Sequence, residues 1–321
     1  MATPDQPMEG LLADIGGTNA RFALCAPGGD PHSALVLACA DYPSLVEAAV
    51  TYLERAAPSV LPTVGAFCIA SPVQGDTVAM TNHAWRFSIE STRRTLGLQY
   101  LSVINDFVAV GLSVPRLSPR HRTKVGGGVP ISNAPVAIIG PGTGLGVALL
   151  LPVEGRWHAI PTEGGHVTMT ATNEEEHTVL SILRQRFGHV SAERLLSGPG
   201  LVNLYNTLAQ MERTMPAPLE PGDITGRAVS GDDPLCVRTL RMFIAMLGTV
   251  AGNLTLSTGA LGGVYIAGGI VPRFASTVEA TSFRERFEDK GRFHDYISRV
   301  PTYIITHPYP AFLGLSGLLS A

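Results

Sequence analysis

Near the start of the chain, apolar residues form short continuous runs separated by a glycine turn. Residues 11–13 are apolar and lead into Asp14, a Gly-Gly-Thr turn follows at 16–18, and residues 21–24 lead away from it. Continuous apolar runs of this length, bounded by glycine, are typical of buried strands. The pattern therefore predicts a strand, a glycine turn and a second strand.

The following segments alternate between helical and strand patterns. Apolar side chains recur at helical spacing over residues 42–55, residues 64–70 predict a buried strand, and residues 101–104 predict another strand, which ends in Asn105 and Asp106. Alternation of strands and helices indicates an α/β fold, in which helices cover the faces of a sheet.

The opening pattern returns in the second part of the chain. Residues 136–139 are apolar, residues 140–144 form a glycine turn, and residues 147–151 lead away from it, as in the first strand–turn–strand segment. Between the two copies, residues 115–128 lose this periodicity and contain prolines and three consecutive glycines. Such a segment indicates a domain boundary or a long connection.

We therefore expect two α/β domains built on one plan. The smaller domain spans residues 1–115 and is completed by a C-terminal helix within residues 308–321, and the larger domain spans residues 116–307. In the larger domain, Asn173 precedes three glutamates and predicts a helix start, and Gly188 predicts its end. Ser191 is expected to cap the next helix.

The composition excludes several classes of function. Apolar residues make up 45% and charged residues 15% of the 321 residues, and the net charge is −3. This balance gives no general attraction to nucleic acid or to anionic membranes. The N-terminal residues lack the apolar core of a signal peptide. The four cysteines are scattered without metal-ligand spacing, which favours a reducing, cytoplasmic environment over a disulfide framework.

One uncharged stretch is, by its length alone, long enough to cross a membrane. Residues 242–272 contain no charged residue. Asn253 and the glycine pairs at 262–263 and 268–269 interrupt this stretch. We interpret it as a core helix that ends near Thr258, followed by a short core strand.

The glycine turns are candidate phosphate-binding sites, because glycine lets backbone N–H groups approach a phosphate with no Cβ in the way. Asp14 precedes the first turn and could hold Mg²⁺ through water. Each turn alone could equally be a simple hairpin, and neither matches the P-loop or the dinucleotide-binding pattern. A third pair, at 268–269, favours a nucleotide site.

Polar residues that could bind an alcohol substrate follow the predicted strands. Asp106 could orient a hydroxyl group and accept its proton in a phosphoryl transfer. The alternative is that Asn105 and Asp106 only start a loop or cap a helix. Glu163, His166 and Glu193 could bind sugar hydroxyls, whereas the histidines lack the spacing of a metal site.

Taken together, these segments resemble the bacterial glucokinase family, which is distinct from the repressor-related sugar kinases. The resemblance runs from about residue 11 almost to the C-terminus. Its order and number of motifs are specific, although each motif alone is weak. The segments that carry it are residues 14–21, 80–83, 104–107, 142–146, 163–166, 189–194 and 266–272.

The resemblance implies a ribonuclease H-like fold in both domains, as in actin-like ATPases, an active-site cleft between the domains, and a homodimer. It implies that Asp106 is the catalytic base and that ATP and Mg²⁺ are used. The implied glucose ligands are Asn82, Asn105, Asp106, Glu163, His166 and Glu193. The implied ATP-binding residues are Ala13, Asp14, Ile15, Gly16, Gly17, Thr18, Gly142, Thr143, Gly144, Gly268 and Gly269, with Asp14 near the metal.

One residue departs from the family pattern. Pro141 stands where relatives often carry a small residue such as alanine, and it removes a backbone N–H beside the second turn. The missing N–H is expected to weaken ATP binding. The zinc-binding cysteine cluster and DNA-binding head of the repressor-related kinases have no counterpart here.

The sequence also allows three other functions. The protein could phosphorylate another hexose or an amino sugar, it could be a non-catalytic sugar sensor, or it could be an actin-like filament ATPase. The acid at position 106 argues against a sensor. Glu163 and His166 argue against a filament ATPase, which has no use for sugar ligands.

Overall fold

The computed structural model describes residues 9–81, 83–276 and 282–319. Contacts divide the chain into two compact units. Unit 1 comprises residues 1–117 and 307–321, and unit 2 comprises residues 118–306.

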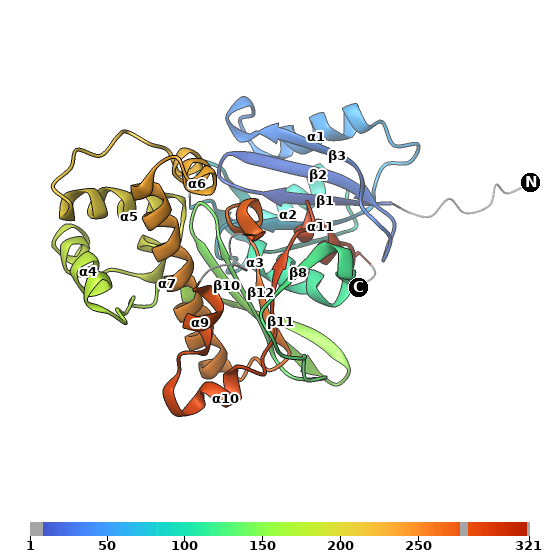
Figure 1. Cartoon of the computed structure of the whole chain (residues 1–321). Helices are drawn as coiled ribbons and strands as arrows, with labels where there is room; N and C mark the ends of the chain where they lie inside the picture. The colour runs from blue at the N-terminus through green and yellow to red at the C-terminus, as the bar shows by residue number, and fades with distance from the viewer. Residues whose placement is uncertain (1–8, 82, 277–281, 320–321) are drawn as a thin grey trace, which may run out of the picture. The chain divides into compact units, whose positions relative to one another are not determined.

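Unit 1 is built on a five-stranded sheet with the strand order β3-β2-β1-β4-β7 (Figure 1). β1, β2 and β3 form an antiparallel meander, whereas β4 and β7 run parallel to β1. The strands span Gly10–Ile15 (β1), Asn19–Cys25 (β2), His32–Ala38 (β3), Val64–Ile69 (β4) and Tyr100–Asn105 (β7). A separate hairpin contains β5 (Thr77–Ala79) and β6 (Arg86–Ser88).

Helices cover both faces of this sheet because its strands are apolar on both sides. Alternate residues of β1, such as Leu11 and Ile15, pack with Tyr52 of α1. Leu12, on the opposite face, packs with Ala109 of α3 and Phe312 of α11. The helices span Leu45–Ala56 (α1), Ile89–Thr95 (α2), Asp106–Ser113 (α3) and Pro310–Ser316 (α11), with short 3₁₀ turns at Cys39–Asp41 (η1) and Val114–Arg116 (η2).

Unit 2 repeats this plan with one additional strand. Its sheet has the order β11-β10-β9-β12-β13-β8, with an antiparallel meander of β9, β10 and β11 followed by the parallel strands β12 and β13. The strands span Arg122–Val125 (β8), Val136–Pro141 (β9), Leu145–Val153 (β10), Arg156–Thr162 (β11), Gly263–Ile266 (β12) and Thr302–Ile305 (β13). Both units therefore have the ribonuclease H-like strand order that the internal repeat and the family resemblance predicted.

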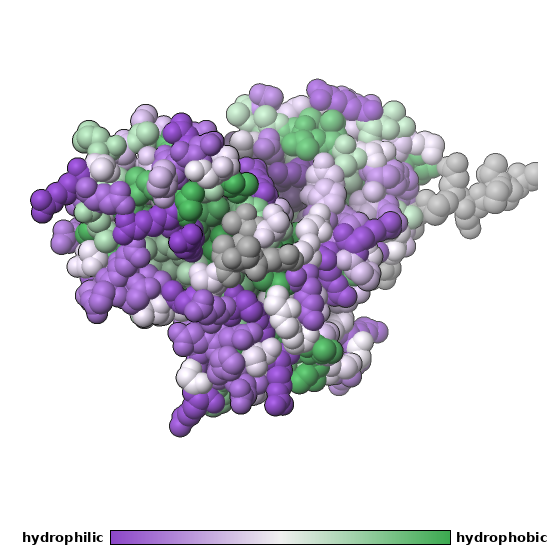
Figure 2. All heavy atoms as spheres, in the orientation of Figure 1, coloured by the Kyte–Doolittle hydropathy of each residue, from purple (hydrophilic) through white to green (hydrophobic). Residues whose placement is uncertain are grey.

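The core of unit 2 contains the longest helix, α7. By length and composition α7 could cross a membrane, yet 78% of its most apolar window is buried inside the protein. α7 is therefore a core helix, as predicted, and the outer face over α9 and α10 is largely hydrophilic (Figure 2). The helices span Glu174–Phe187 (α4), Gly198–Met211 (α5), Pro221–Ser230 (α6), Pro234–Thr258 (α7), Phe283–Glu288 (α9) and His294–Ile297 (α10). The 3₁₀ turns span Pro119–His121 (η3), Gly164–His166 (η4), Ala192–Arg194 (η5), Val271–Phe274 (η6) and Gly291–Phe293 (η7).

The structure differs from two local expectations. Ser191 precedes only the single 3₁₀ turn η5, and its side chain makes no capping hydrogen bond. Ser191 forms a backbone bridge with Thr168, so this chain segment is held by tertiary pairing rather than by a helix. The segment around 115–128, expected to be irregular, contains β8, which pairs with β13 at the edge of the sheet.

Candidate active site

The glycine turn of unit 1 connects β1 and β2. The backbone N–H of Gly16 donates to the carbonyl of Asn19 (2.9 Å), which closes the hairpin. Cys39, which lies outside the hairpin, stabilises the turn through two hydrogen bonds. Its N–H donates to Thr18 O (2.9 Å), and its thiol donates to Gly16 O (3.4 Å). Thr18 is exposed, so ligands can reach the tip of the turn.

Asp14 lies on β1 immediately before this turn. Its Oδ2 is 3.3 Å from Arg21 Nη1, and its side chain is 23% exposed. The thiol of Cys68 on β4 donates to Oδ1 (3.6 Å). Burial raises the pKa of the Asp14 carboxyl, while Arg21 and the hydrogen bond from Cys68 oppose that rise.

Asn105 and Asp106 lie where β7 ends and α3 begins. Asn105 is the N-cap residue, and its Oδ1 accepts hydrogen bonds from the N–H groups of Phe107 (2.9 Å) and Val108 (3.3 Å). Asp106 is the first residue of α3, and its Oδ1 also accepts from Phe107 N (2.9 Å). The capping role considered from the sequence is therefore real for Asn105, and it fixes the position of Asp106.

The carboxyl group of Asp106 is poised to change protonation near neutral pH. Burial, together with the negative charge of Asp14, raises its pKa to about 7. Two carboxyl groups that repel each other within one site are a common arrangement in catalytic sites. This coupling places Asp14 and Asp106 in one electrostatic environment.

Asp14 is the carboxylate of unit 1 that could take part in binding Mg²⁺. Among the described residues, no group of three or more His, Cys, Asp or Glu side chains could hold a metal ion. Mg²⁺ commonly uses one or two carboxylates plus substrate phosphates and water. Asp14, to which the sequence assigns the metal, supplies a hard oxygen ligand of that kind.

The glycine turn of unit 2 connects β9 and β10. Gly142 N–H donates to Gly144 O (2.8 Å), and Gly142 O accepts from the N–H of Gly198 at the start of α5 (2.8 Å). Glu193 in η5 reaches the turn, because its Oε2 accepts the N–H of Leu145 (2.9 Å). A Cβ on Gly144 would lie 2.5 Å from this oxygen, so any other residue there would displace the carboxylate from its present position.

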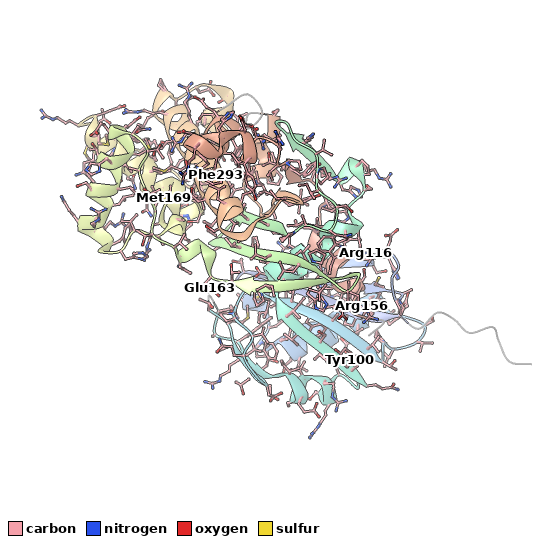
Figure 3. The ribbon with its side chains drawn as sticks, turned by 90° about the horizontal axis from the view of Figure 1, so that it is seen from below. Tyr100, Arg116, Arg156, Glu163, Met169 and Phe293 are labelled. Carbon is pink, nitrogen blue, oxygen red and sulfur yellow. The ribbon has the colours of Figure 1, made fainter. Side chains whose placement is uncertain are left out.

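Glu163 and His166 lie at the two ends of a single turn after β11, where Figure 3 labels Glu163. His166 N–H donates to Glu163 O (2.9 Å), and His166 Nε2 lies 3.9 Å from Glu163 Oε2. Both side chains are mostly exposed and available to a ligand. A Cβ on Gly165 would overlap Leu145 O, so the absence of a side chain at this position allows the turn to pack closely against β10.

Gly268 and Gly269 follow β12. Gly268 has a positive φ of 87°, and a Cβ there would overlap the carbonyl oxygen of Pro141. Ala267 N–H donates to Ile139 O (2.8 Å), which continues the β12–β9 pairing up to this point. Gly268 is therefore required to bring this loop close to Pro141 and the adjacent turn.

The predicted residues thus form two groups, one in each unit. In unit 1, the turn at Ala13–Thr18 follows β1 and the pair Asn105–Asp106 ends β7, and these two strands of one sheet are separated by β4. In unit 2, Glu193 contacts the Gly142–Gly144 turn, and the turn containing Glu163 and His166 packs against η5 and β10. Asn82 lies outside the described residues.

Sequence reasoning missed the two thiols that contact the first site. The sequence shows only that Cys68 and Cys39 lack metal-ligand spacing, and in the structure both are fully buried. Their hydrogen bonds to Asp14 and Gly16 depend on which strands are neighbours in the sheet. No local sequence signal carries that information.

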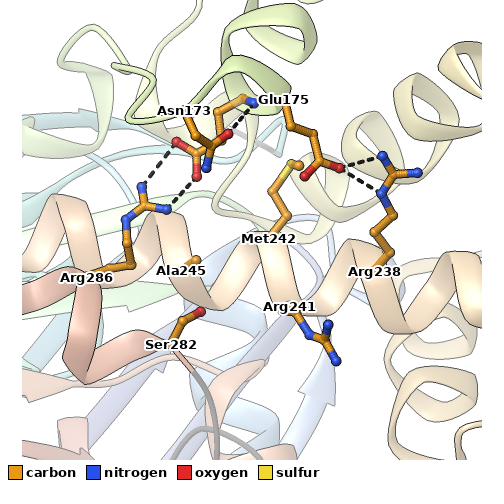
Figure 4. Close-up of a pocket in the computed structure, with 9 residues that line it drawn as sticks. Asn173, Glu175, Arg238, Arg241, Met242, Ala245, Ser282 and Arg286 are labelled. Atoms are coloured by element: carbon orange, nitrogen blue, oxygen red, sulfur yellow. Dashed lines mark hydrogen bonds and ion pairs between the residues drawn. The ribbon is translucent and has the colours of Figure 1, made fainter.

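A separate cavity of about 370 Å³ in unit 2 contains none of the predicted site residues. Figure 4 shows its ion pairs, in which Arg238 holds Glu175 (2.6 Å) and Arg286 holds Glu176 (2.7 Å). Both carboxylates are already paired with arginine, so this cavity is a structural ion-pair cluster in the helical layer.

Comparisons with known proteins agree with this description. A sequence model of the family named Glucokinase matches residues 11–321. The chain is 52% identical to a glucokinase of Paramagnetospirillum magneticum, over 97% of each chain. It is 34% identical to the crystal structure of a glucokinase from an Antarctic psychrotroph, with a TM-score of 0.87 and coverage of 98% of this chain and 99% of that one.

A more distant structure shares the fold. A ROK-family glucokinase from Streptomyces griseus, solved with glucose and AMPPNP, is 18% identical, with a TM-score of 0.68 and coverage of 97% and 99%. The two ribonuclease H-like units and these matches define the class: an ATP-dependent sugar kinase. Within that class, the chain belongs to the glucokinase family.

Proposed function

We propose that this protein transfers the γ-phosphate of ATP to the 6-hydroxyl of glucose, with Asp106 as the general base. The observation that carries the assignment is the placement of Asp106 at the C-terminal end of β7, with a pKa of about 7. A base whose pKa is near the operating pH combines a useful deprotonated fraction with enough basicity to take a proton. The transferred proton leaves the sugar hydroxyl as its oxygen attacks phosphorus, and ADP departs.

In this proposal, ATP phosphates are bound by the two glycine turns. The residues are Ala13–Thr18 in unit 1 and Gly142–Gly144 in unit 2, and Gly268 and Gly269 face the adenosine. Mg²⁺ bound with ATP would be held near Asp14 through water and would neutralise charge on the phosphates. Arg21 Nη1 lies 3.3 Å from Asp14 Oδ2 and helps to fix the orientation of that carboxylate.

Glucose is bound by Asn82, Asn105, Asp106, Glu163, His166 and Glu193. The support for this set is chemical, because carboxylates, an amide and an imidazole offer the acceptors and donors that sugar hydroxyls require. Glu193 uses Oε2 for Leu145 N–H, which leaves Oε1 for a sugar hydroxyl. The ligands named in the Streptomyces griseus structure, glucose and AMPPNP, are consistent with the two proposed substrates.

The test is Asp106→Asn. Asparagine keeps the size and hydrogen-bonding capacity of the side chain but cannot accept the proton, so kcat should fall at least about 100-fold while glucose binding stays similar. The measurement is steady-state kinetics beside calorimetric titration with glucose. Near-normal turnover would remove Asp106 from the role of base.

The alternative substrates are other hexoses and amino sugars. A panel of glucose, mannose, fructose and glucosamine in an ADP-release assay, compared by kcat/KM, decides between them. The proposal requires glucose to be preferred. A filament ATPase would instead release ADP at the same rate without any sugar.

We further propose that the enzyme is a cytoplasmic homodimer. All four cysteines are free and buried, which suits a reducing compartment. The homodimer rests on the family resemblance alone. Light scattering coupled to size-exclusion chromatography, with a monomer mass of 33.9 kDa, tests the dimer directly.

A further inference from the structure

Cys68 lies in a row of side chains that crosses the sheet of unit 1 toward the catalytic carboxyl groups. In the strand register, Asp14 of β1 is opposite Cys68 of β4, and Cys68 is opposite Ile104 of β7. Residues directly opposite one another in a sheet project from the same face. The row therefore places the thiol between Asp14 and the strand end that leads to Asp106.

The thiol of Cys68 contacts the Asp14 carboxylate in a hydrogen-bonding geometry. Its Sγ lies 3.6 Å from Oδ1, while Arg21 Nη1 lies 3.3 Å from Oδ2. Each oxygen of the carboxylate thus has a different side-chain donor. Two donors on the two oxygens restrict rotation of the carboxylate about the Cβ–Cγ bond of Asp14.

The thiol is suited to remain a donor. Cys68 is fully buried. Its Sγ atom lies beside the Asp14 carboxylate, which can only accept a hydrogen bond when ionised. A buried thiol of this kind is inert as a nucleophile, and the S–H group is left to donate a hydrogen bond.

We propose that Cys68 is a positioning residue, whose thiol holds the Asp14 carboxylate in the orientation that receives Mg²⁺ and ATP. This inference rests on the role proposed above for Asp14. It assigns to a core cysteine a part in nucleotide binding, in addition to its packing beside Leu12, Ala66 and Ala109.

Replacing Cys68 with alanine and with serine separates the hydrogen bond from the packing. Cys68→Ala removes the donor, and we expect KM for Mg–ATP to rise about fivefold while KM for glucose is unchanged, because a hydrogen bond to a charged group is lost. Cys68→Ser retains a donor and should remain within about twofold of the wild-type value. Calorimetric titration with Mg–AMPPNP gives the same comparison without turnover.

Cys25→Ala is the matched control. Cys25 is as buried as Cys68 and lies in the same apolar cluster, but its thiol donates to the carbonyl groups of Ala26 and Gly29. This control should leave KM for Mg–ATP unchanged even if it lowers Tm. An equal rise in KM for Cys25→Ala and Cys68→Ala, or equal weakening by serine and alanine at position 68, would overturn the proposal.

Asp14→Asn distinguishes failure of this inference from failure of the proposed site. If Asp14→Asn leaves Mg–AMPPNP binding intact, the assignment of Asp14 is wrong. If Asp14→Asn weakens binding and Cys68→Ala does not, only the role of Cys68 is wrong. When both residues act together, the double variant should bind as weakly as Asp14→Asn alone, whereas additive losses would contradict a shared role.

Discussion

Glu193 accepts a hydrogen bond from the backbone N–H of Leu145, with 2.9 Å between Oε2 and the nitrogen. Leu145 is the first residue after the Gly142–Gly144 turn, and Glu193 is a proposed glucose ligand. One side chain therefore contacts the turn proposed for ATP, and in our proposal its other oxygen binds the sugar. A change in the turn should therefore alter the KM for glucose, because it moves this carboxylate.

Gly144→Ala is expected to raise KM for glucose about fivefold or more without unfolding the protein. The new methyl group would lie 2.5 Å from Glu193 Oε2, and the flexible carboxylate can move away where a backbone group could not. Gly142→Ala is the control, because its Cβ would meet no atom closer than 4.0 Å. Initial rates over a glucose series, with circular dichroism as the folding check, decide the outcome. Equal glucose KM values in the two variants would contradict the coupling.

Activity should fall as pH decreases through about 7. Burial and the charge of Asp14 raise the pKa of Asp106 to about 7, and the base must be deprotonated to accept a proton. Above that pH the carboxylate is available, and well below it kcat/KM for glucose should drop about tenfold per pH unit. A pH series at low ATP and glucose concentrations measures this. A profile that stays flat down to pH 5 would show that Asp106 titrates lower.

Gly268→Ala should destabilise the protein by roughly 2 kcal/mol or more. A positive φ of 87° disfavours a side chain, and the new Cβ would overlap the carbonyl of Pro141, which is backbone and cannot rotate away. Gly269→Ala has open space and ordinary φ, so it should cost far less. Urea denaturation of both variants compares them directly, and equal midpoints would contradict the steric argument.

Arg286→Met should cost about 3–5 kcal/mol of unfolding free energy, because it leaves the buried Glu176 carboxylate unpaired. Glu176 is 2% exposed, and Arg286 binds both of its oxygens (2.7 and 3.1 Å). The double variant Glu176→Gln, Arg286→Met should recover most of the loss. Denaturation midpoints of the single and double variants give the test, and a double variant no more stable than Arg286→Met would contradict it.

The same pair predicts how stability depends on pH. Burial acts to raise the pKa of Glu176, but hydrogen bonds from Arg286 and Thr172 outweigh it, so the folded-state pKa lies below the ordinary 4.5. The stabilisation is therefore present above about pH 4.5 and is lost as pH falls through the folded-state pKa. The double variant should lack this part of the acid sensitivity.

Much of the fold could be predicted because its signals are local. Asn173 accepts the N–H of Glu176 as the N-cap of α4, and Gly188 ends that helix, as expected. The strand–turn–strand repeat gave the correct first hairpin of each sheet, since glycine turns and apolar runs need no distant partner. The core assignment of α7 was also correct, because glycine pairs and polar residues marked its limits.

What the sequence did not indicate depends on contacts between distant segments. β8 is four residues long, contains arginine and lysine, and becomes a strand only through its pairing with β13. Ser191 is held by its bridge to Thr168, 23 positions earlier, instead of acting as a helix cap. The bond from Cys68 to Asp14 spans 54 positions and follows from strand register alone.

The position of α11 has a consequence for the order in which the protein is made. Phe312 and Leu315 pack beside Leu12 and Ala66, so the last helix of the chain completes the core begun by the first strand. During synthesis, unit 2 emerges as one continuous segment and can form its core before residues 307–321 are available. Unit 1 is completed only when residues 307–321 have joined residues 1–117, so the core beneath the site containing Asp14 and Asp106 forms after unit 2 has been synthesised.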